Sequence, residues 1–576
     1  MIKQDIKKAL VNIIHEFWGS DSLADLDIEV VKPNNNQGDY ANSSAFGLGK
    51  KLDLSPAEIA SKLVQALDGK IVGVSRIESA GGFVNFFVTP EYLHEELLNI
   101  SKQENYGASE TLKGKTIMVE FTDPNPFKLF HIGHLMSNTI GESIARLYEA
   151  LGARVLRVNW QGDVGIHIAM AVWAIKAGKV GNIPADDAPI MDRVNYLGRA
   201  YTAGSLAYRD GGPKIKAEIE AVNAEIYAKD NSEVVEIYNK GKTWSLDYFE
   251  EIYKRLGTKF DHYFFESEIG PIGLEIVKQN PEVFKESEGA IVFKGEEYGL
   301  HTRVFVNSKG LPVYEAKELG LNKTKFDLYH PELSIIITGN EINEYFKVLL
   351  KVMSLIMPEV AEKTRHIGHG MMRLTTGKMS SRTGDVVTAD ALIEQTKAKL
   401  KDKESVQTIT DPKERENTAE AIAIGAIKYS ILKQSPGKDI VFDFEKSLAI
   451  KGDSGPYLQY TYSRLFSILK KAEQANFQFS IFSLQLLKEE SELNLIKYFL
   501  EFPEAVREAS EMIAPQRLAL YLFELANLAN NFYENVHILE DEDSSRMSAR
   551  LLLVRVTAEI LSRGLAILGI KTPVRI

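Results

Sequence analysis

The chain has 576 residues, of which 44% are hydrophobic and 26% are charged, and its net charge is −11. That length predicts three or four soluble globular units, and no apolar run is long enough to cross a bilayer. Because the chain has no cysteine, disulfides and thiolate zinc sites are excluded, and its acidic balance argues against a nonspecific DNA binder but not against RNA binding through a local basic face.

Residues 1–110 are predicted to form an α+β N-terminal domain. Helix-like stretches ("IKKALVNIIHEFW" and "PAEIASKLVQAL") flank the loop "KPNNNQGDYAN", and the strand-like run "GFVNFFV" follows. The polar segment "SKQENYGASETLKGK" marks the end of this domain. The first helix is amphipathic and carries acidic residues, unlike a signal peptide, so we expect a cytoplasmic protein with no membrane partner.

The next elements predict a strand, a loop, a helix and a second strand. Thr116–Phe121 is a short apolar run of the buried-strand type, and the loop "TDPNPFKLF" follows it. "RVLRVNW" is the second strand, and this order is the first crossover of a parallel, doubly wound sheet, in which ligands bind beyond the carboxyl ends of the strands. The helix is indicated by apolar residues three or four apart, with a glycine just past its end: Met136, Ile140, Ile144, Leu147, Leu151 and Gly152.

The rest of the chain predicts a split catalytic domain and a helical bundle. Residues 176–257 have the pattern of a helical insertion, after which strands at 290–295, 302–306 and 333–338 are expected to resume the sheet. The predicted fold is α/β, with a split doubly wound (Rossmann-type) parallel-sheet domain at 111–390. An all-α C-terminal helical bundle is predicted over 391–576.

The tetrapeptide HIGH occurs twice, at 131–134 and at 366–369. In the first copy, His131 and His134 would share one face of a helix's first turn, where free N–H groups and the macrodipole favour an anion, and Gly133 would let a nucleotide lie against the backbone. The alternative is two ordinary polar residues at a helix start, but the buried strand before them favours function. The second copy follows no predicted strand and opens no helix, so it is interpreted as accidental, with His369 as a candidate neighbour of the site.

A second segment, "GKMSSRTGD", carries ammonium, guanidinium and hydroxyl groups between glycines. Lys378, Ser380, Ser381 and Arg382 in this loop (377–385) are able to wrap a polyphosphate. A loop of this composition, taken alone, is more often a solvent-exposed loop that binds no ligand. Paired with a strand-end HIGH about 240 residues earlier, it is much more specific.

With both segments in place, the sequence resembles the arginyl-tRNA synthetases, a family of class I synthetases whose signatures are HIGH and KMSKS. The resemblance extends in order through "VEFTDPNPFKLFHIGHLMSNTIGESIARL", "NWQGDVGIH", "LPVYEAKELGL" and "GDSGPYLQYTYSR" to the closing "ARLLLVRVTAEILSRGLAILGIKTP". It implies that ATP with Mg²⁺ activates L-arginine to arginyl-adenylate. The arginyl group then passes to the 2′-hydroxyl of the terminal adenosine of tRNA(Arg), and bound tRNA is generally needed for the activation.

The resemblance also implies site residues. The ATP site matches His131, Gly133, His134, Lys378 and Met379, with Ser380 and Ser381 also closing over the phosphates. The arginine site matches Glu120, Asn125, Glu266, Tyr314 and Glu318. A guanidinium is a permanent, forked cation that needs carboxylates in position for parallel hydrogen bonds, and the three glutamates would supply them.

Three positions depart from the family pattern. Ser381 stands where most class I enzymes have a second lysine, and we assign the missing charge to Lys128, three residues before HIGH. Glu318 replaces an aspartate, and Ile342 stands where many members have a glutamine. These changes bear on the geometry of arginine binding rather than on the choice of amino acid.

Candidate tRNA contacts lie at both ends of the chain. The N-terminal candidates are Asn36, Gln37 and Tyr40, for which a simple turn is the alternative. The C-terminal candidates are Tyr457, Tyr460, Asn530, Phe532 and Tyr533. Aromatic residues at helical spacing are more often core residues. Since no obligate interface is suggested, a monomer is expected.

Three other protein classes agree less well with the sequence than an arginyl-tRNA synthetase does. A class I synthetase for glutamate or glutamine would place three carboxylates around an anionic or neutral side chain. A small nucleotidylyltransferase needs neither the second loop nor a helical C-terminal third. A non-catalytic tRNA-binding relative would have lost His131, His134 or the signature loop, and all three are present.

Overall fold

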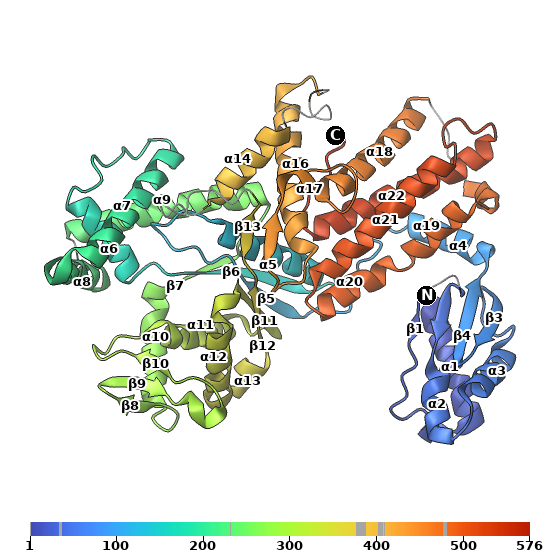
Figure 1. Cartoon of the computed structure of the whole chain (residues 1–576), viewed down its shortest axis with the longest axis horizontal. Helices are drawn as coiled ribbons and strands as arrows, with labels where there is room; N and C mark the ends of the chain where they lie inside the picture. Colours follow the sequence, from blue (N-terminus) through green and yellow to red (C-terminus); the bar gives the residue numbers. More distant parts are fainter. Residues whose placement is uncertain are drawn as a thin grey trace. The chain divides into compact units, whose positions relative to one another are not determined.

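The computed structural model describes residues 2–33, 37–230, 232–375, 387–400, 407, 409–475 and 481–576 (Figure 1). It divides into two compact units. Unit 1 contains residues 1–107, 464–504 and 524–561, and unit 2 contains 108–463, 505–523 and 562–576. Each unit is described by itself below. Among the described residues, no helix combines the length and the apolar character that a bilayer crossing requires.

The N-terminal part of unit 1 is an α+β layer, drawn in blue in Figure 1. Its antiparallel sheet has the order β1-β2-β4-β3. The strands are β1 (Val30–Val31), β2 (Tyr40–Asn42), β3 (Val74–Ala80) and β4 (Phe83–Val88), and the helices are α1 (Ile2–Trp18), η1 (Ser20–Ser22), α2 (Ser44–Leu52), α3 (Pro56–Leu67) and α4 (Pro90–Ser101). The apolar faces of α1 and α3 are fully buried, as the sequence periodicity predicts.

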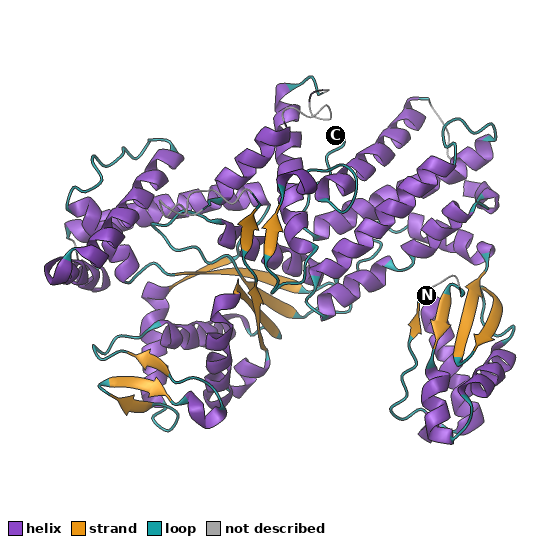
Figure 2. Ribbon diagram, viewed as in Figure 1, coloured by secondary structure: helices purple, strands orange, loops and turns teal. Residues whose placement is uncertain are grey.

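Unit 2 is built on a five-stranded parallel sheet of order β12-β11-β5-β6-β7 (Figure 2). The strands are β5 (Thr116–Glu120), β6 (Arg154–Gln161), β7 (His262–Phe265), β11 (Leu333–Gly339) and β12 (Thr364–His369). From β5 the chain proceeds to β6 and β7 on one side, then returns to β11 and β12 on the other. The topological switch point therefore lies between β5 and β11, and the carboxyl ends of these strands are where a ligand is expected.

The structure corrects one part of the predicted sheet. The runs at 290–295 and 302–306 do not rejoin the parallel sheet, because they form an antiparallel sheet of their own: β8 (Lys285–Ser287), β9 (Ala290–Phe293) and β10 (Arg303–Val306). Two strands that the sequence did not reveal, β7 and β12, take the edge positions instead. Both are short, and β7 is only partly buried, so neither has the continuous apolar run of a central strand.

A group of helices lies between β6 and β7: α6 (Ile166–Lys176), α7 (Ile190–Asp210), α8 (Gly212–Ala228) and α9 (Glu233–Leu256). They share a buried apolar core (Figure 1). One member of that core, Phe127, comes from the loop after β5, and its backbone N–H donates to the Ser245 hydroxyl at 2.9 Å. The inserted helices thus hold the loop that precedes the first HIGH.

The other elements of unit 2 lie between the strands of the parallel sheet in the chain or after them. They are α5 (Ile132–Ala150), α10 (Glu266–Gln279), η2 (Gly295–Tyr298), α11 (Tyr314–Tyr329), η3 (Asn340–Ile342), α12 (Asn343–Ile356), α13 (Pro358–Glu362), β13 (Met372–Leu374), α14 (Ala389–Leu400), α16 (Pro412–Leu432), β14 (Ile440–Phe442) and α17 (Phe444–Ser447). The helical bundle follows: α18 (Gly455–Gln474), η4 (Ile481–Leu486), α19 (Glu490–Phe499), α20 (Phe502–Glu511), α21 (Pro515–Asn535) and α22 (Ser544–Ile567).

Helix α5 is buried along most of its length, and its five predicted core residues are all inside. Gly152 follows it with a φ of +87° and a close approach to Ser109, as a C-terminal glycine should. Near its end the almost fully buried Glu142 accepts hydrogen bonds from Arg146 at 2.6 Å and from Arg157 at 2.9 Å. This carboxylate is the shared partner of two guanidinium groups.

The same end of α5 is tied to the ends of two other helices. Arg146 of α5 and the buried Lys428 of α16 each donate to two backbone carbonyl oxygens. A helix terminus leaves its last carbonyls unpaired, and cations there are favourable. The four acceptors lie at or just beyond the carboxyl ends of α9 and α22: Leu256, Gly257, Ala566 and Gly569.

We predict that Glu142→Ala lowers the free energy of unfolding by about 3 kcal/mol, since it leaves two guanidinium groups without their buried counter-charge. Urea denaturation followed by tryptophan fluorescence measures this, because Trp160 and Trp173 both lie in unit 2. Asp327→Ala, which removes an exposed ion pair with Lys323, is the control and should change stability by less than about 0.5 kcal/mol. Equal effects of the two substitutions would contradict the prediction.

Candidate active site

The first HIGH opens helix α5 with a hydrogen-bonded pair of histidines. His131 is the N-cap residue, and its Nδ1 accepts from the backbone N–H groups of Gly133 at 3.1 Å and His134 at 3.3 Å. His134 Nδ1 in turn accepts from the backbone N–H of His131 at 3.3 Å, which completes a capping box. The two rings are stacked, with centroids 3.6 Å apart.

This cap fixes how the two rings are protonated. A backbone N–H can only donate, so each Nδ1 must present a lone pair, and the proton of each neutral ring must be on Nε2. Burial, with the nearby Lys128 ammonium, lowers the pKa of His131 to about 4, and burial with the His131 ring lowers that of His134 well below its ordinary value. Both histidines are therefore neutral Nε2–H donors at physiological pH.

Gly133 has a steric role in the same motif. A Cβ at this position would lie 2.9 Å from two ring atoms of His131. The glycine thus makes room for the histidine ring that caps its own helix. This function is additional to the predicted approach of a nucleotide to the backbone.

Lys128 lies in the loop between β5 and α5, close to both histidines. Its charge contributes to the lowered pKa of His131, His134 and His167, and its Nζ lies 5.2 Å from the centre of the Tyr201 ring. Burial lowers the pKa of Lys128 itself, with Glu266 as the opposing charge. The structure therefore brings the predicted lysine to the predicted histidines.

The second signature segment contains Lys378, Met379, Ser380 and Ser381, which lie outside the described residues. The chain that follows it is anchored at the first HIGH. Ile132 donates to the Val387 carbonyl at 3.0 Å, and Ala389 donates to the Phe130 carbonyl at 2.9 Å. The residues that follow this segment, 387–389, thus lie beside the histidine cap.

The second HIGH is strand β12 itself, paired in parallel with β11. His366 stacks on Phe346, with ring centroids 3.7 Å apart, and hydrogen-bonds to Thr338 at 2.7 Å. A Cβ at Gly368 would collide with Asn343, so the glycine serves packing. His369, at the carboxyl end of the strand, contributes to the lowered pKa of His131 and His134 and so lies near the site.

A buried acidic cluster lies where β5 ends. Glu120, 1% exposed, pairs with the fully buried Lys325 of α11 at 2.7 Å. Glu318, also 1% exposed, is on the same helix, and its Oε2 has no hydrogen-bond partner among the described residues. Burial, and after it the charge of Glu120, raise the pKa of Glu318 to about 8. Two carboxylates share one ammonium here.

Two tyrosines complete the wall of this cluster. Burial and the charge of Glu318 raise the pKa of Tyr314 well above its ordinary value, and the Tyr345 ring lies 5.0 Å from the Tyr314 ring. The Tyr345 hydroxyl is buried without a partner in the described part of the chain. Ile342 belongs to the short η3 turn just before the helix that carries Tyr345.

Sequence reasoning missed Asp123, the third carboxylate of the cluster. Burial, followed by the charges of Glu120 and Glu318, raises its pKa well above the ordinary value. Its φ of +48° follows a φ of +83° at Thr122, an uncommon backbone for non-glycine residues. The sequence signal for it was an acidic residue within the loop that precedes the first HIGH.

The third predicted glutamate, Glu266, has different partners. It begins α10 and pairs with Lys317 at 2.5 Å, and burial raises its pKa despite that partner. Asn125 Oδ1 accepts from the Gly162 backbone N–H at 3.1 Å, and a Cβ on Gly162 would contact both Asn125 and Glu266. The predicted arginine-binding residues therefore form two groups, one around Glu120 and one around Glu266.

The predicted tRNA contacts differ in accessibility. Asn36 lies outside the described residues, and Gln37 next to it is exposed. Tyr40 is buried at 4% exposure with its hydroxyl hydrogen-bonded, which favours a packing role. Tyr457 and Tyr460 are half-buried on α18.

The C-terminal half of α21 presents the more accessible group. Phe532 is 1% exposed and belongs to the core, whereas Tyr533 is 41% exposed. Arg464 lies 5.0 Å from the Tyr533 ring and donates to Asn530 Oδ1 at 2.9 Å. An aromatic face and an amide of α21 thus lie beside a guanidinium of α18.

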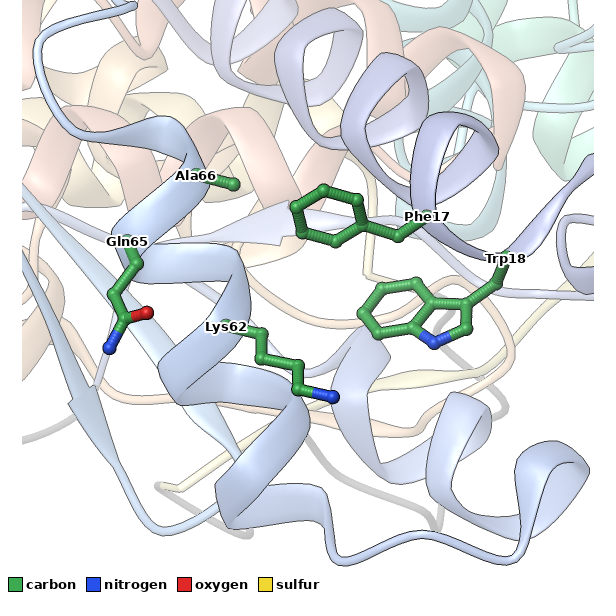
Figure 3. A pocket seen from close by; sticks show the side chains of 5 residues that line it. All are labelled: Phe17, Trp18, Lys62, Gln65 and Ala66. Atoms are coloured by element: carbon green, nitrogen blue, oxygen red, sulfur yellow. The ribbon is translucent and has the colours of Figure 1, made fainter.

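A groove of about 550 Å³ lies in the N-terminal part of unit 1 (Figure 3). Phe17 and Trp18 line it opposite Lys62, Gln65 and Ala66. Lys62 is the one ionisable side chain among these five residues. Elsewhere in the described residues, no three histidine or carboxylate side chains are grouped to hold a metal ion.

Comparison with known families covers nearly the whole chain. Residues 96–444 match the family described as tRNA synthetases class I (R), catalytic domain. Residues 458–576 match the DALR anticodon binding domain, and residues 1–88 match the arginyl tRNA synthetase N terminal domain.

Individual relatives agree with these matches. The chain is 33% identical to the arginine–tRNA ligase of Treponema denticola, over 92% of each chain, and 30% identical to that of Halothermothrix orenii, over 99% of each. Among solved structures, the Thermus thermophilus arginyl-tRNA synthetase aligns over the full length of both chains, with a TM-score of 0.80 and 25% identity.

We predict that Gly133→Ala weakens ATP binding by at least about tenfold, because the added methyl group must displace the His131 ring. Isothermal titration with ATP measures the change. Gly198→Ala is the control, since its Cβ would meet its nearest neighbours at 3.5 Å, an ordinary contact. Unchanged ATP affinity in Gly133→Ala would show that the histidine stack does not contribute to nucleotide binding.

Proposed function

Since the chain belongs to the class I arginyl-tRNA synthetase family and is an arginine–tRNA ligase that uses ATP, we propose specific roles for its site residues. The carboxylate of arginine attacks the α-phosphorus of ATP, pyrophosphate leaves, and arginyl-adenylate forms. The 2′-hydroxyl of the terminal adenosine of tRNA(Arg) then attacks the carbonyl carbon, and AMP leaves. The histidine cap carries the first step of this proposal.

His131 and His134 donate hydrogen bonds through Nε2–H to phosphate oxygens of ATP. Their neutrality supports this role, since a fixed neutral donor gains most from charge that develops in the transition state. Lys128 supplies the positive charge, in the place of the lysine that Ser381 replaces. Lys378, Met379, Ser380 and Ser381 close over the phosphates from a segment whose end pairs with Phe130 and Ile132.

Arginine binds with its guanidinium at Glu120 and Glu318 and its α-amino end at Asn125 and Glu266. The unpaired Glu318 oxygen and the shortage of buried cations around Glu120 support the first half of this assignment. The nearness of Glu266 to Lys128 supports the second half, because it places the reacting end of the amino acid towards the phosphates. The nearness of Tyr314 to Glu318 supports a place for this tyrosine in the wall of the same site.

Mg²⁺ accompanies ATP as part of the substrate and neutralises its phosphates. A monomeric state, a cytoplasmic location and a requirement for bound tRNA during activation stay predictions from the sequence. Arginine-dependent ATP–pyrophosphate exchange, with and without tRNA(Arg), is the decisive assay for the residue roles and for the tRNA requirement. Exchange that is absent under both conditions, or faster with glutamate or lysine, would overturn the proposed site.

We predict that Lys128→Ala slows tRNA-supported exchange by about 100-fold, the usual effect of removing one transition-state donor. Binding of tRNA(Arg), measured by filter retention, should not change. Lys323→Ala, at an exposed lysine of α11, is the matched control and should exchange at the normal rate. A normal rate in Lys128→Ala would assign the positive charge to another residue.

The group on α21 is proposed to contact unpaired bases of tRNA. Tyr533 would stack on a base, and Arg464 beside it would add a cation near the phosphate backbone. Asn530, held by Arg464, offers its amide to a base edge. Phe532 supports the helix from the core.

We predict that Tyr533→Ala weakens tRNA(Arg) binding by about 10-fold, within the range for loss of one stacked base. Tyr298→Ala is the control, because Tyr298 is similarly exposed at 44% but lies in the catalytic unit away from α21 in sequence. Filter binding at fixed salt compares the two. Equal affinities for Tyr533→Ala and the wild-type protein would remove Tyr533 from the interface.

A further inference from the structure

The carboxylates at the end of β5 outnumber the cations that face them. Glu120 closes the strand, Asp123 follows three residues later, and Glu318 approaches from α11. Among the described residues, Lys325 is the one ammonium that pairs with this group. A buried group with this imbalance is stable only with protons bound or with a cation bound.

A second observation points to a ligand in this cluster. Glu318 is 1% exposed, yet its Oε2 accepts no hydrogen bond in the described part of the chain, and the buried Tyr345 hydroxyl beside it is also unpartnered. Buried polar atoms are nearly always paired, and an unpaired carboxylate oxygen is costly. The chemistry of the cluster is therefore that of a binding site for a cation with several hydrogen-bond donors.

Asp123 is held in this cluster by an unusual backbone. Thr122 and Asp123 both have positive φ, which is strained for residues other than glycine, and more so for a β-branched threonine. The strain is maintained by hydrogen bonds: the Thr122 N–H donates to Ser137 at 2.9 Å, and Asn138 donates to the Thr122 hydroxyl at 3.1 Å. Retained strain of this kind clusters at ligand sites.

The two oxygens of Asp123 have different surroundings. Oδ1 accepts from the Trp160 backbone N–H of β6 at 2.8 Å, which fixes the plane of the carboxylate. No hydrogen bond to Oδ2 occurs within the described residues, and the side chain is only partly covered, unlike Glu120 and Glu318. One oxygen is thus an anchor, and the other is available to a ligand.

We propose that Asp123 is a specificity residue of the arginine site, whose free oxygen accepts a hydrogen bond from the substrate guanidinium alongside Glu120 and Glu318. This inference rests on the proposed location of the guanidinium at those two glutamates. A guanidinium has five N–H donors in a planar fork, so it has enough donors for three carboxylates. A neutral side chain of the same shape cannot compensate the charge of this cluster.

The role of Asp123 is therefore to select a permanent cation over a neutral isostere. Citrulline is the natural probe, because its urea group has nearly the shape of a guanidinium and no charge. Replacing the negative charge of Asp123 should weaken the binding of arginine more than the binding of citrulline. The difference between the two affinities should therefore become smaller. Because Ile342 has no hydrogen-bonding side chain, we expect the third carboxylate, that of Asp123, to contribute more to the binding of arginine.

Asp123→Asn tests this proposal. Asparagine keeps an oxygen for the Trp160 N–H and tolerates a left-handed backbone, so the substitution removes the charge alone. We expect the KM for arginine in tRNA-supported exchange to rise about 10- to 100-fold with little change in kcat, the range for a lost charged hydrogen bond. The ratio of arginine to citrulline affinities, measured by competition, should fall by a similar factor.

Asp261→Asn is the matched control. Asp261 also accepts from a backbone N–H of β6, that of Arg157 at 2.9 Å, but Arg157 lies three residues before Trp160 in the strand. Its substitution should leave the KM for arginine unchanged. An Asp123→Asn enzyme with normal KM and a normal arginine-to-citrulline ratio would show that Asp123 is only a backbone anchor.

The pH profile gives a readout that an anchor would not move. Raised carboxylate pKa values mean that the empty cluster holds protons at neutral pH, and the cationic substrate must displace them. In the wild-type enzyme kcat/KM for arginine should therefore rise with pH up to about 8. In Asp123→Asn this rise should occur at lower pH, because one repelling charge is gone.

The outcomes distinguish this inference from the proposed function. No arginine-dependent exchange in the wild-type enzyme would overturn the proposed function itself. Normal exchange in the wild-type enzyme, with an unchanged pH profile and KM in Asp123→Asn, would overturn the role of Asp123 alone. Circular dichroism and the melting temperature verify that the variant is folded.

Discussion

A deficit of positive charge at the carboxyl end of β5 is the constraint around which the catalytic unit is arranged. Glu120 must be buried because β5 is a central strand, and Lys325 is fully buried to accompany it. Neither Glu318 nor Asp123 has a cation of its own among the described residues. This part of the protein is therefore costly to fold without a ligand, and the guanidinium proposed to bind there would compensate its charge.

The part of the site that is proposed to bind phosphate uses neutral donors rather than an excess of charge. The histidine cap uses two rings that are kept neutral by burial and by Lys128, and its donors are fixed in direction by backbone hydrogen bonds. Charge is therefore concentrated in separate places: negative around Glu120 and Glu318, positive at Lys128. The neutral histidines between them can approach anionic oxygen without a desolvated charge of their own.

The sequence predicted the elements whose patterns are long or chemically distinctive. The strand before the first HIGH, the periodic helix behind it and the helical bundle are all present. It did not predict β7 and β12, because short edge strands lack a continuous apolar run. It also could not assign the strands at 290–306 to a separate sheet, since strand pairing is decided by tertiary contacts rather than by local pattern.

The residues of the site divide in the same way into those that the sequence predicted and those that it did not. Residues next to a recognisable motif, such as Lys128 and His134, could be proposed from sequence. The separation of Glu266 from Glu120, and the entry of Asp123 into the cluster, depend on partners more than 30 residues away in the chain. Such groupings follow from the crossing of strands at the switch point, which one sequence does not reveal.

Helix α5 joins the phosphate site to the far end of the chain. It is 19 residues long, about 28 Å at 1.5 Å per residue, and it has the histidine cap at its first turn and Arg146 near its last. Because Arg146 holds the carbonyl of Ala566, the position of the cap is defined partly by residues more than 400 places later in the sequence. The final turn of α22 is in this sense a support of the histidine cap, and changes there bear on the position of α5 as well as on stability.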